Sequence, residues 1–405
     1  DYRLEDQDVN LQMRVLTIKQ DELTKLYGNY VKAGIGNYGT LYLKGYFHNK
    51  RSNVASYGAD VSHITSARGP VDGKNSAVTN SAINVNGEAS MQGLTLGGKL
   101  GYGRDKYHFY GYSPVQETTV DRDTISQVFN RVNAEGYMHN HGAGMPLLFK
   151  AGLNVNYLND RYDMRETNIA AKLNTEYGLD DVSAFKVDAD LSLVAHKDSA
   201  SVNRTLFKLH PQYERQLNAI RLSIGANIAY TGDTVNDARK FNVYPTVRVG
   251  VEPIKDNLLI YAGIGGDLQR VTLYQLTQEN PFLAPNVRVA DQNKGLEVYG
   301  GMQANIANFV HLTGRVAYQN FRNMYFYNNS ASDSTKFDLL YDDGVTNVLN
   351  IYGEATFNYS DELRIGLKAD YNKYSTASLE QAFHRPELMA SVFATYNFYD
   401  KILFN

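Results

Sequence analysis

Two histidines, His139 and His141, stand one residue apart and are the first candidates for chemistry. Imidazoles at this spacing hold a metal ion when a third ligand, a carboxylate or another histidine, is near. No third ligand is near in the sequence, so we expect no metal site. The chain also contains no Cys, which excludes a disulfide framework, a thiolate zinc site, an iron–sulfur cluster and a cysteine nucleophile.

Three further histidines, His63, His196 and His311, lie in segments of alternating polarity. A catalytic histidine needs an Asp or Ser within hydrogen-bond reach, and no motif marks such a partner. The glycine-rich stretch Gly97–Gly103 is not followed by a helical segment, so it fails the context test for a phosphate-binding loop. We therefore predict a protein that is not an enzyme, with no catalytic residue, no cofactor and no metal.

Charged side chains recur on one face of the alternating segments, where basic and acidic residues are mixed. Mixed signs on one wall are compatible with a polar channel lining or with cross-strand ion pairs, and a single-sign selectivity ring is not seen. We predict that these side chains face a lumen. They are Lys150, Lys186, Asp188, Asp190, Arg221, Arg248, Glu297, Arg315, Glu354, Arg364 and Lys368.

A short motif recurs in which Asp precedes Ser or Thr and then Thr or a small apolar residue. It resembles the O-glycosylation acceptor used in Bacteroidota, and ordinary polar loop composition is the alternative explanation. The hydroxyl residues concerned are Thr124, Ser199, Thr234 and Ser334.

The elements that carry these residues alternate with period two, which is typical of a strand with one apolar and one polar face. In residues 149–157, Phe149, Leu153 and Tyr157 are among the residues of one face, while Lys150 and Asn154 belong to the other. We count about 16 to 18 such segments. Most have ten or more residues, close to the ~9–11 that cross a bilayer at a tilt.

Three features favour lipid over a second sheet as the partner of the apolar faces. The polar face recurs along the whole chain, short connections tend to alternate with long ones, and aromatic residues collect at strand ends. No run of 18 apolar residues occurs, and the mean hydropathy is −0.41. We predict an all-β chain with an antiparallel transmembrane β-barrel at 27–405 and a periplasmic segment at 1–26; a soluble sandwich or propeller is the alternative. The predicted interfacial aromatic residues include Tyr107, Phe109, Tyr162, Tyr325, Phe326, Tyr327 and Tyr374.

Several turns and prolines test this strand assignment. We expect a tight turn at Arg215–Gln216, and we expect one of the two breaks at Asn37–Gly39 and Arg51–Asn53 to be a bulge within a strand. Pro211 and Pro245 fall inside strands and lack the N–H of a ladder bond, so each predicts a bulge or a locally open pair.

Four segments resemble a family of TonB-dependent-receptor-like outer-membrane barrels of Bacteroidota: Gly28–Tyr38, Ser56–His63, Tyr261–Arg270 and Glu279–Phe282. The resemblance rests on strand and turn patterns and covers most of the chain. It implies a plug domain and a TonB box before the barrel, whereas strands begin here at about residue 28. It also implies further strands after the turn at 399–401, so we expect the chain to be part of a longer barrel.

Without a visible plug, the main functional prediction is a non-enzymatic scaffold or accessory subunit of an outer-membrane assembly or secretion complex. The alternative is a transport barrel, either a passive pore or a receptor whose plug is supplied elsewhere. Expected partners are outer-membrane lipid, lipopolysaccharide and other envelope proteins, with no nucleic acid because the charge is balanced. The expected location is the outer membrane of a Gram-negative bacterium.

Overall fold

The computed structural model describes residues 28–49, 52, 54–112, 120–142, 144–307, 309–358, 362–398 and 402–404. The predicted periplasmic segment 1–26 and the predicted turn 399–401 lie outside these residues. Among the described residues, no helix is long and apolar enough to cross a membrane.

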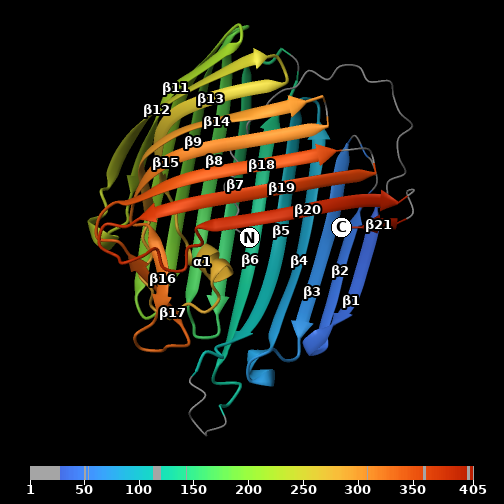
Figure 1. The fold of residues 1–405 in the computed structure, drawn as a ribbon, viewed down its shortest axis with the longest axis vertical. Coiled ribbons are helices and arrows are strands. Elements are labelled where there is room, and N and C mark those ends of the chain that lie inside the picture. The colour runs from blue at the N-terminus through green and yellow to red at the C-terminus, as the bar shows by residue number, and fades with distance from the viewer. Residues whose placement is uncertain are drawn as a thin grey trace.

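Strands make up most of the described chain, and one short α-helix and three 3-10 turns interrupt them (Figure 1). The first strands are β1 (Asn29–Gly36), β2 (Thr40–His48), β3 (Ala55–Ser66), β4 (Val78–Met91), β5 (Leu94–His108), β6 (Ser126–Asn140), β7 (Leu147–Asp160), β8 (Arg165–Asp180), β9 (Ser183–Lys197) and β10 (Ser201–Leu217). The later strands are β11 (Ile220–Thr231), β12 (Phe241–Ile254), β13 (Leu258–Gln269), β14 (Gln292–Ile306), β15 (Val310–Arg322), β16 (Tyr325–Asn329), β17 (Phe337–Tyr341), β18 (Thr346–Asn358), β19 (Leu363–Ser375), β20 (Leu388–Phe398) and β21 (Ile402–Phe404). The other elements are α1 (Leu273–Glu279), η1 (Asn37–Gly39), η2 (Gly73–Ser76) and η3 (Val235–Asp237).

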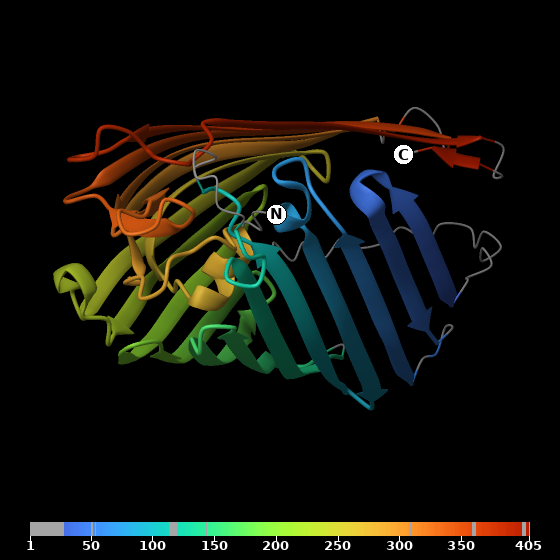
Figure 2. The ribbon, with the colours of Figure 1, turned by 90° about the horizontal axis from the view of Figure 1, so that it is seen from below.

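Nineteen strands form one antiparallel sheet, and β16 pairs only with β17 in a separate hairpin. Each strand of the large sheet pairs with the next one along the chain, and β15 pairs with β18 across the inserted hairpin. The sheet curls into a deep, curved wall with α1 and the hairpin on its concave side (Figure 2). The count lies just above the predicted 16 to 18 because the three-residue strand β21 also pairs with the sheet.

The two faces of this wall differ as the alternation predicts. Directly opposed residues on neighbouring strands share a face, so the register extends a face assignment from one strand to the next. Leu158 of β7 is buried against residues of α1, which fixes the concave face at the even positions of that strand. On the convex face, Leu153 is 51% exposed and Leu367 is 50% exposed. An apolar surface on long strands is what a barrel presents to lipid.

Connections at one end of the sheet are short, as at 92–93, 181–182 and 255–257. Those at the other end include the long segments 109–125, 270–291, 323–345 and 376–387. The long connections therefore gather at a single end of the barrel.

Two turn predictions were wrong. The strand β10 continues through Arg215 and Gln216 to Leu217, so the turn comes at 218–219. At the N-terminal side neither break is a bulge: Asn37–Gly39 separates β1 from β2, and β2 ends at His48 before β3 begins at Ala55. Both are changes of strand, and the connection lengths are reversed there, because 37–39 lies at the long end and 49–54 at the short end.

The proline predictions are confirmed. Pro211 is opposite Val187 of β9, but the pairing of β10 with β11 is interrupted between Leu209 and Gln212. Pro245 is opposite Ala226 of β11, and on its other side the pairing of β12 with β13 starts only at Val247. Each proline thus sits where one ladder is open and no N–H is required.

Candidate functional site on the concave face

The connection 270–291, which we call the inner segment, folds onto the concave face and carries α1. The helix begins after Thr272, whose side chain accepts a hydrogen bond from the backbone N–H of Gln275 at 3.2 Å. This is an N-cap, which satisfies one of the free N–H groups of the first turn. The helix ends at Glu279, and the N–H of the C-cap residue Asn280 donates to the carbonyl of Leu276 at 2.7 Å.

A carboxylate from the barrel wall holds the start of the helix. Glu166 of β8 accepts the backbone N–H groups of Leu273 at 2.9 Å and Tyr274 at 2.8 Å, and it is only 2% exposed. A negative charge on the free N–H groups of a helix start is favourable, and burial strengthens the interaction. Glu166 therefore ties α1 to the wall.

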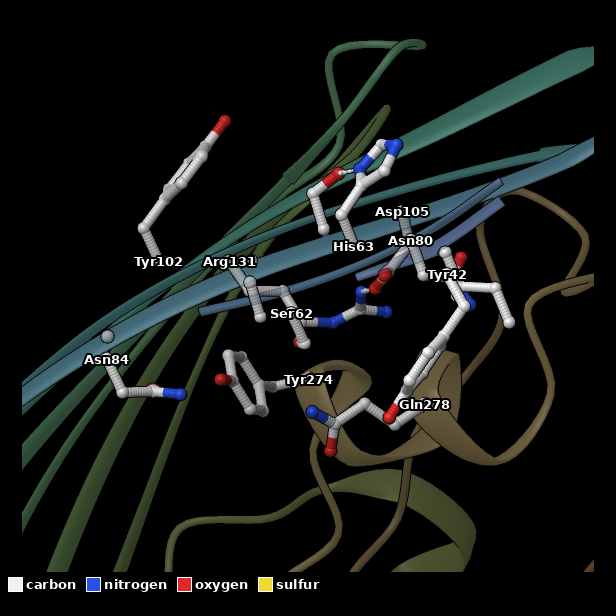
Figure 3. Close-up of a pocket in the computed structure, with 15 residues that line it drawn as sticks. Tyr42, Ser62, His63, Asn80, Asn84, Tyr102, Asp105, Arg131, Tyr274 and Gln278 are labelled. Carbon is white, nitrogen blue, oxygen red and sulfur yellow. Dashed lines mark hydrogen bonds and ion pairs between the residues drawn. The ribbon is translucent and has the colours of Figure 1, made fainter. Parts of the chain in front are cut away.

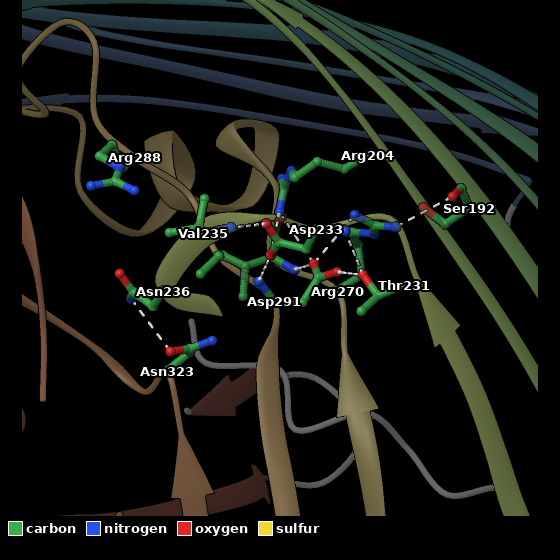
Figure 4. Close-up of polar contacts among 12 residues, drawn as sticks. Ser192, Arg204, Thr231, Asp233, Val235, Asn236, Arg270, Arg288, Asp291 and Asn323 are labelled. Carbon is green, nitrogen blue, oxygen red and sulfur yellow. Dashed lines mark hydrogen bonds and ion pairs between the residues drawn. The ribbon is translucent and has the colours of Figure 1, made fainter. Parts of the chain in front are cut away.

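Both ends of the inner segment meet in one buried ion cluster, which we call the root cluster (Figure 4). Arg204 of β10 lies 3.2 Å from the carboxylate of Asp291 and donates to the carbonyl of Val271 at 2.6 Å. Arg270 also reaches Asp291, at 3.3 Å. Since removing one member of a buried charge network leaves an uncompensated charge, such a change costs about 3–5 kcal/mol.

Two other groups complete the root cluster. The hydroxyl of Thr231 donates to Asp291 at 3.0 Å, and the backbone N–H of Asp291 donates to Asp233 at 2.7 Å. Burial raises the pKa of Asp291, and the arginines oppose this shift. Burial lowers the pKa of Arg270 to about 10.

An apolar core joins the inner segment to the wall. Leu276 of α1 and Leu158 of β7 are completely or almost completely buried in it. The buried members of this core are Phe129, Leu158, Met164, Val271, Leu273, Leu276, Leu283, Val289, Tyr325 and Tyr327. This core fixes the inner segment as a folded unit on the wall.

The connection 323–345, which contains the hairpin β16–β17, is the second part of this folded unit. Phe337 exchanges backbone hydrogen bonds with Phe282 and Ala284, both at 2.8 Å. The hydroxyl of Tyr341 accepts the N–H of Ala290 at 2.8 Å and donates to the carbonyl of Arg288 at 2.9 Å. The hairpin and the inner segment are thus bonded to each other along their length.

A third connection, 376–387, closes over the hairpin. Arg385 lies 4.4 Å from the ring centre of Tyr325 and 3.5 Å from the carboxylate of Glu279. Burial raises the pKa of Glu279 and lowers the pKa of Arg385 to about 10. Asp342 accepts backbone N–H groups of Ala377 and Ser378, each at 2.7 Å. We call the three connections together the inner gate.

Beside α1 the concave face is hollowed into a cavity of about 320 Å³, which we call the inner cavity (Figure 3). Strands β2 to β6 form its floor, and Tyr274 and Gln278 of α1 overhang it. Its charged pair is Asp105 with Arg131, which are hydrogen-bonded to each other. Arg131 also donates to Thr277 of α1 at 3.0 Å, so the helix and the cavity share a side chain.

The strand register brings all eleven charged residues of the predicted lumen set onto the concave face. Lys186 pairs across strands with Glu214 at 2.8 Å, and Arg315 pairs with Glu297 at 2.5 Å. Arg221 lies 3.7 Å from Glu252. Cross-strand pairing is therefore part of this face. The other members are Lys150, Asp188, Asp190, Arg248, Glu354, Arg364 and Lys368.

The predicted glycosylation residues are exposed and stand in connections at the long end. Thr124 donates to the carbonyl of Asp121 at 2.7 Å, and Ser199 donates to the side chain of Asn286 in the inner segment. Thr234 and Ser334 are also exposed. Their glycosylation stays a prediction.

Histidines and glycines singled out above take ordinary structural places. The rings of His139 and His141 lie 6.1 Å apart. The described residues hold no group of three His, Asp or Glu side chains that could bind a metal ion. Gly97 lies in β5, where a Cβ would collide with the ring of Tyr137, so close packing explains it.

Part of the aromatic prediction was wrong. Tyr325, Phe326 and Tyr327 are buried in the inner gate, where Phe326 is 0% exposed. Phe109 is likewise buried, with an edge contact to Phe282. A short aromatic run has the same pattern beside lipid and inside a folded connection, so local sequence does not separate the two.

The residues that organise the site were missed in the sequence. Glu166, Arg204 and Arg131 lie on the polar faces of their strands, near the end of the sheet with the long connections. Arg270 and Asp291 are the first and last residues of the inner segment. The same alternation that marked the eleven charged residues marks the three strand residues. Their burial could not be predicted from the sequence, because it is the inner segment that covers them.

Solved structures similar to this chain include an iron transporter, a siderophore receptor and an outer-membrane receptor. The FrpB iron transporter from Neisseria meningitidis (F3-3 variant) matches with a TM-score of 0.68 at 10% identity, over 93% of this chain and 68% of that chain. The siderophore receptor PirA from Pseudomonas aeruginosa matches with a TM-score of 0.58 at 13% identity, over 83% of this chain and 62% of that chain. The alcaligin outer-membrane receptor FauA from Bordetella pertussis gives 0.61 at 10% identity, over 91% and 64%.

These likenesses show the fold. The chain is an antiparallel transmembrane β-barrel, and it spans between 62% and 68% of the length of the three structures. With its apolar convex face, this fold places the chain in the outer membrane of a Gram-negative cell. No protein-family model and no curated protein matches the sequence. The Bacteroidota part of the resemblance has no support among these structures and stays a prediction.

Proposed function

We propose that the chain is the barrel of an outer-membrane transport protein, with the charged concave face lining the route and the inner gate narrowing it. The observation that carries this proposal is the inner segment, which two buried arginines and Glu166 hold on the concave face. A barrel of this many strands has a lumen wide enough for water, so a folded gate inside it has a clear use. Similar structures with names such as iron transporter and siderophore receptor support transport over a scaffold.

Transport here needs no chemistry of bond making, and we propose a non-enzymatic role. The mixed charges of the concave face form a polar lining without a strong preference for one sign. Lipid and lipopolysaccharide are the expected surroundings of the convex face. Envelope proteins remain expected partners, and the residues described here single out no surface for them.

Planar-bilayer recordings test the proposal directly. The intact protein is compared with a variant in which a short Gly-Ser linker replaces residues 272–289, leaving Arg270 and Asp291 in place. We expect low conductance from the wild type and a several-fold larger conductance from the variant, because the gate has been removed while the wall stays. A matched control replaces 67–77, at the same end, which hydrogen-bonds to Tyr112 and Val120 outside the gate.

Three results contradict the proposal. If the wild type conducts as strongly as the 272–289 variant, the inner segment does not narrow the route. An equal gain from the 67–77 control shows that any loosened connection has the same effect. A protein that stays silent after replacement of 272–289 and co-purifies in fixed stoichiometry with envelope proteins is a scaffold.

A further inference from the structure

The inner cavity has a lining whose chemistry selects one class of ligand. Its side chains come from strands that are neighbours in the sheet, and from α1 above them. The cavity volume of about 320 Å³ is at the lower end of the range of about 300–1,000 Å³ typical of small-molecule sites. A small ligand therefore fits, and the polar groups around it decide which one.

Small residues keep the floor of the cavity open. Ala82 of β4 is opposite Gly103 of β5, and Asn84 is opposite Gly101. A Cβ on Gly101 would lie 2.5 Å from the side-chain oxygen of Asn84, so only glycine leaves that amide in place. The floor thus combines a shallow surface with an amide group held at a fixed position.

The charges in the lining cancel. Asp105 and Arg131 are the charged side chains among the described lining residues, and they are paired with each other. Arg131 is 5% exposed, so its charge is committed to Asp105 and to the hydroxyl of Thr277. An anionic ligand would find no surplus positive charge here, and a cation would find no surplus negative charge.

The remaining groups are neutral hydrogen-bonding groups and aromatic rings. Tyr42 and Tyr274 offer flat apolar faces with a hydroxyl at the rim. Gln278 carries an amide with both a donor and an acceptor, whereas Asn84 already donates to the carboxylate of Asp60 at 2.7 Å and offers its amide oxygen. In addition, the side-chain oxygen of Asn80 is buried without a hydrogen-bond partner. Unmet hydrogen-bonding capacity beside a cavity is what a polar ligand satisfies.

Side-chain direction separates the cavity from the outer surface (Figure 3). Tyr42, Tyr274 and Gln278 point into the hollow, whereas Tyr102 and His63 project from the opposite side of the sheet. The hydroxyl of Tyr102 donates to Asn130 on that convex side. Tyr102 is among the lining residues, but its side chain points away from the hollow, so it provides an internal control for rings that point into it.

We propose that the inner cavity binds a neutral, polyhydroxylated ligand such as a short oligosaccharide. Ligand hydroxyls act as donors and acceptors toward the amides, and the C–H faces of a sugar ring lie on the phenol rings. The inference rests on the proposed transport function and names its substrate class. It differs from the iron and siderophore named for the similar structures, since a ferric siderophore of high negative charge would meet a lining without net charge.

The test is isothermal titration of the intact protein in detergent with maltotriose, cellotriose and xylotriose, and with ferric enterobactin as the charged probe. We expect at least one neutral trisaccharide to bind and ferric enterobactin not to bind at the cavity. Tyr42→Ala is expected to raise the Kd about tenfold, and Gln278→Ala about threefold, because each removes one ligand contact. The matched controls Tyr102→Ala and Gln275→Ala are expected to leave the Kd unchanged.

Gln278 and Gln275 are both exposed on α1, so these substitutions leave the fold intact and keep the test decisive if Tyr42→Ala fails to fold. Failure of all three saccharides to bind at millimolar concentration overturns the inference, as does an equal loss in the variants and their controls. Binding of ferric enterobactin that depends on Tyr42 also overturns it. Conductance separates the two proposals: a gated pore without saccharide binding refutes only the ligand class, and saccharide binding to an ungated, silent barrel refutes only transport.

Discussion

At the residue scale, one buried carboxylate ties the helix of the inner segment to the wall. Glu166 meets two backbone N–H groups of α1 and is shielded from water on all sides. The helix has seven residues, too few to be stable alone, so its stability comes from this anchor and from the apolar core. A change at Glu166 therefore acts on the gate before it acts on the barrel.

We expect Glu166→Ala to loosen α1 by about 1–3 kcal/mol, because the two N–H groups of Leu273 and Tyr274 lose their buried acceptor. Amide hydrogen exchange of 271–279 measures this directly. The matched control is Glu176→Ala on the same strand and the same face, where the carboxylate makes a half-exposed pair with Lys186 at 3.4 Å. Equal loss of protection in both variants would show that Glu166 has no special role.

At the element scale, the connections of the gate hold one another through a few polar contacts. Asp342 follows the hairpin and accepts three backbone N–H groups and a hydroxyl from the connection 376–387. These hydrogen bonds favour the ionised form and lower the pKa of Asp342 to about 2 against the burial that raises it. The two connections are therefore joined by a carboxylate that must stay charged.

The pH dependence of this joint follows from the lowered pKa. The stabilisation is fully present above the unfolded value of about 3.9 and is lost as the pH falls through the folded value of about 2, a change on the order of 2 kcal/mol. We expect the protection of the Ala377 and Ser378 amides, corrected for intrinsic exchange, to fall between about pH 4 and pH 2 in the wild type.

In Asp342→Asn the protection should be low already at about pH 5 and change little with pH. Its neighbour Asp343 is exposed, and Asp343→Asn is expected to keep the wild-type profile. A profile in Asp342→Asn like that of the wild type would assign the pH dependence to another group.

The sequence alone predicts the strands well, but it does not predict how the long connections fold onto the concave face. Alternation located the strands and put Lys186, Arg315 and the other nine charged residues on one face, since that pattern depends on neighbouring residues only. The inner gate depends on contacts between distant residues, such as Glu166 with Leu273 and Arg204 with Asp291. No local pattern records these contacts, and the aromatic run at 325–327 was placed at the membrane interface for the same reason.

At the scale of the whole molecule, the two faces of the wall place neighbouring residues of one strand in opposite environments. Leu153 and Asn154 are adjacent in the middle of β7, with Leu153 on the convex face and Asn154 on the concave face. Lipid surrounds the first and polar groups surround the second, where Asn154 accepts a hydrogen bond from Asn156 at 2.5 Å. The same substitution at the two positions should therefore have unequal effects.

We expect Leu153→Arg to destabilise the barrel by about 2–4 kcal/mol, the cost of a cation near the bilayer midplane, and Asn154→Arg to cost less than about 1 kcal/mol. Urea unfolding in lipid vesicles measures both free energies. Equal costs at the two positions would contradict the assignment of the convex face to lipid.

The root cluster also determines how the inner gate can move. Arg270 and Asp291, at the two feet of the inner segment, form an ion pair, and the wall residue Arg204 contacts both Asp291 and the carbonyl of Val271. With both feet held at one point, we expect the segment to open by rotation about that point, with its middle near Glu279 moving the greatest distance. A segment tethered at both feet never leaves the barrel, so its closing is an intramolecular step whose rate does not depend on protein concentration. We therefore expect the proposed gate to close again without a separate part having to return.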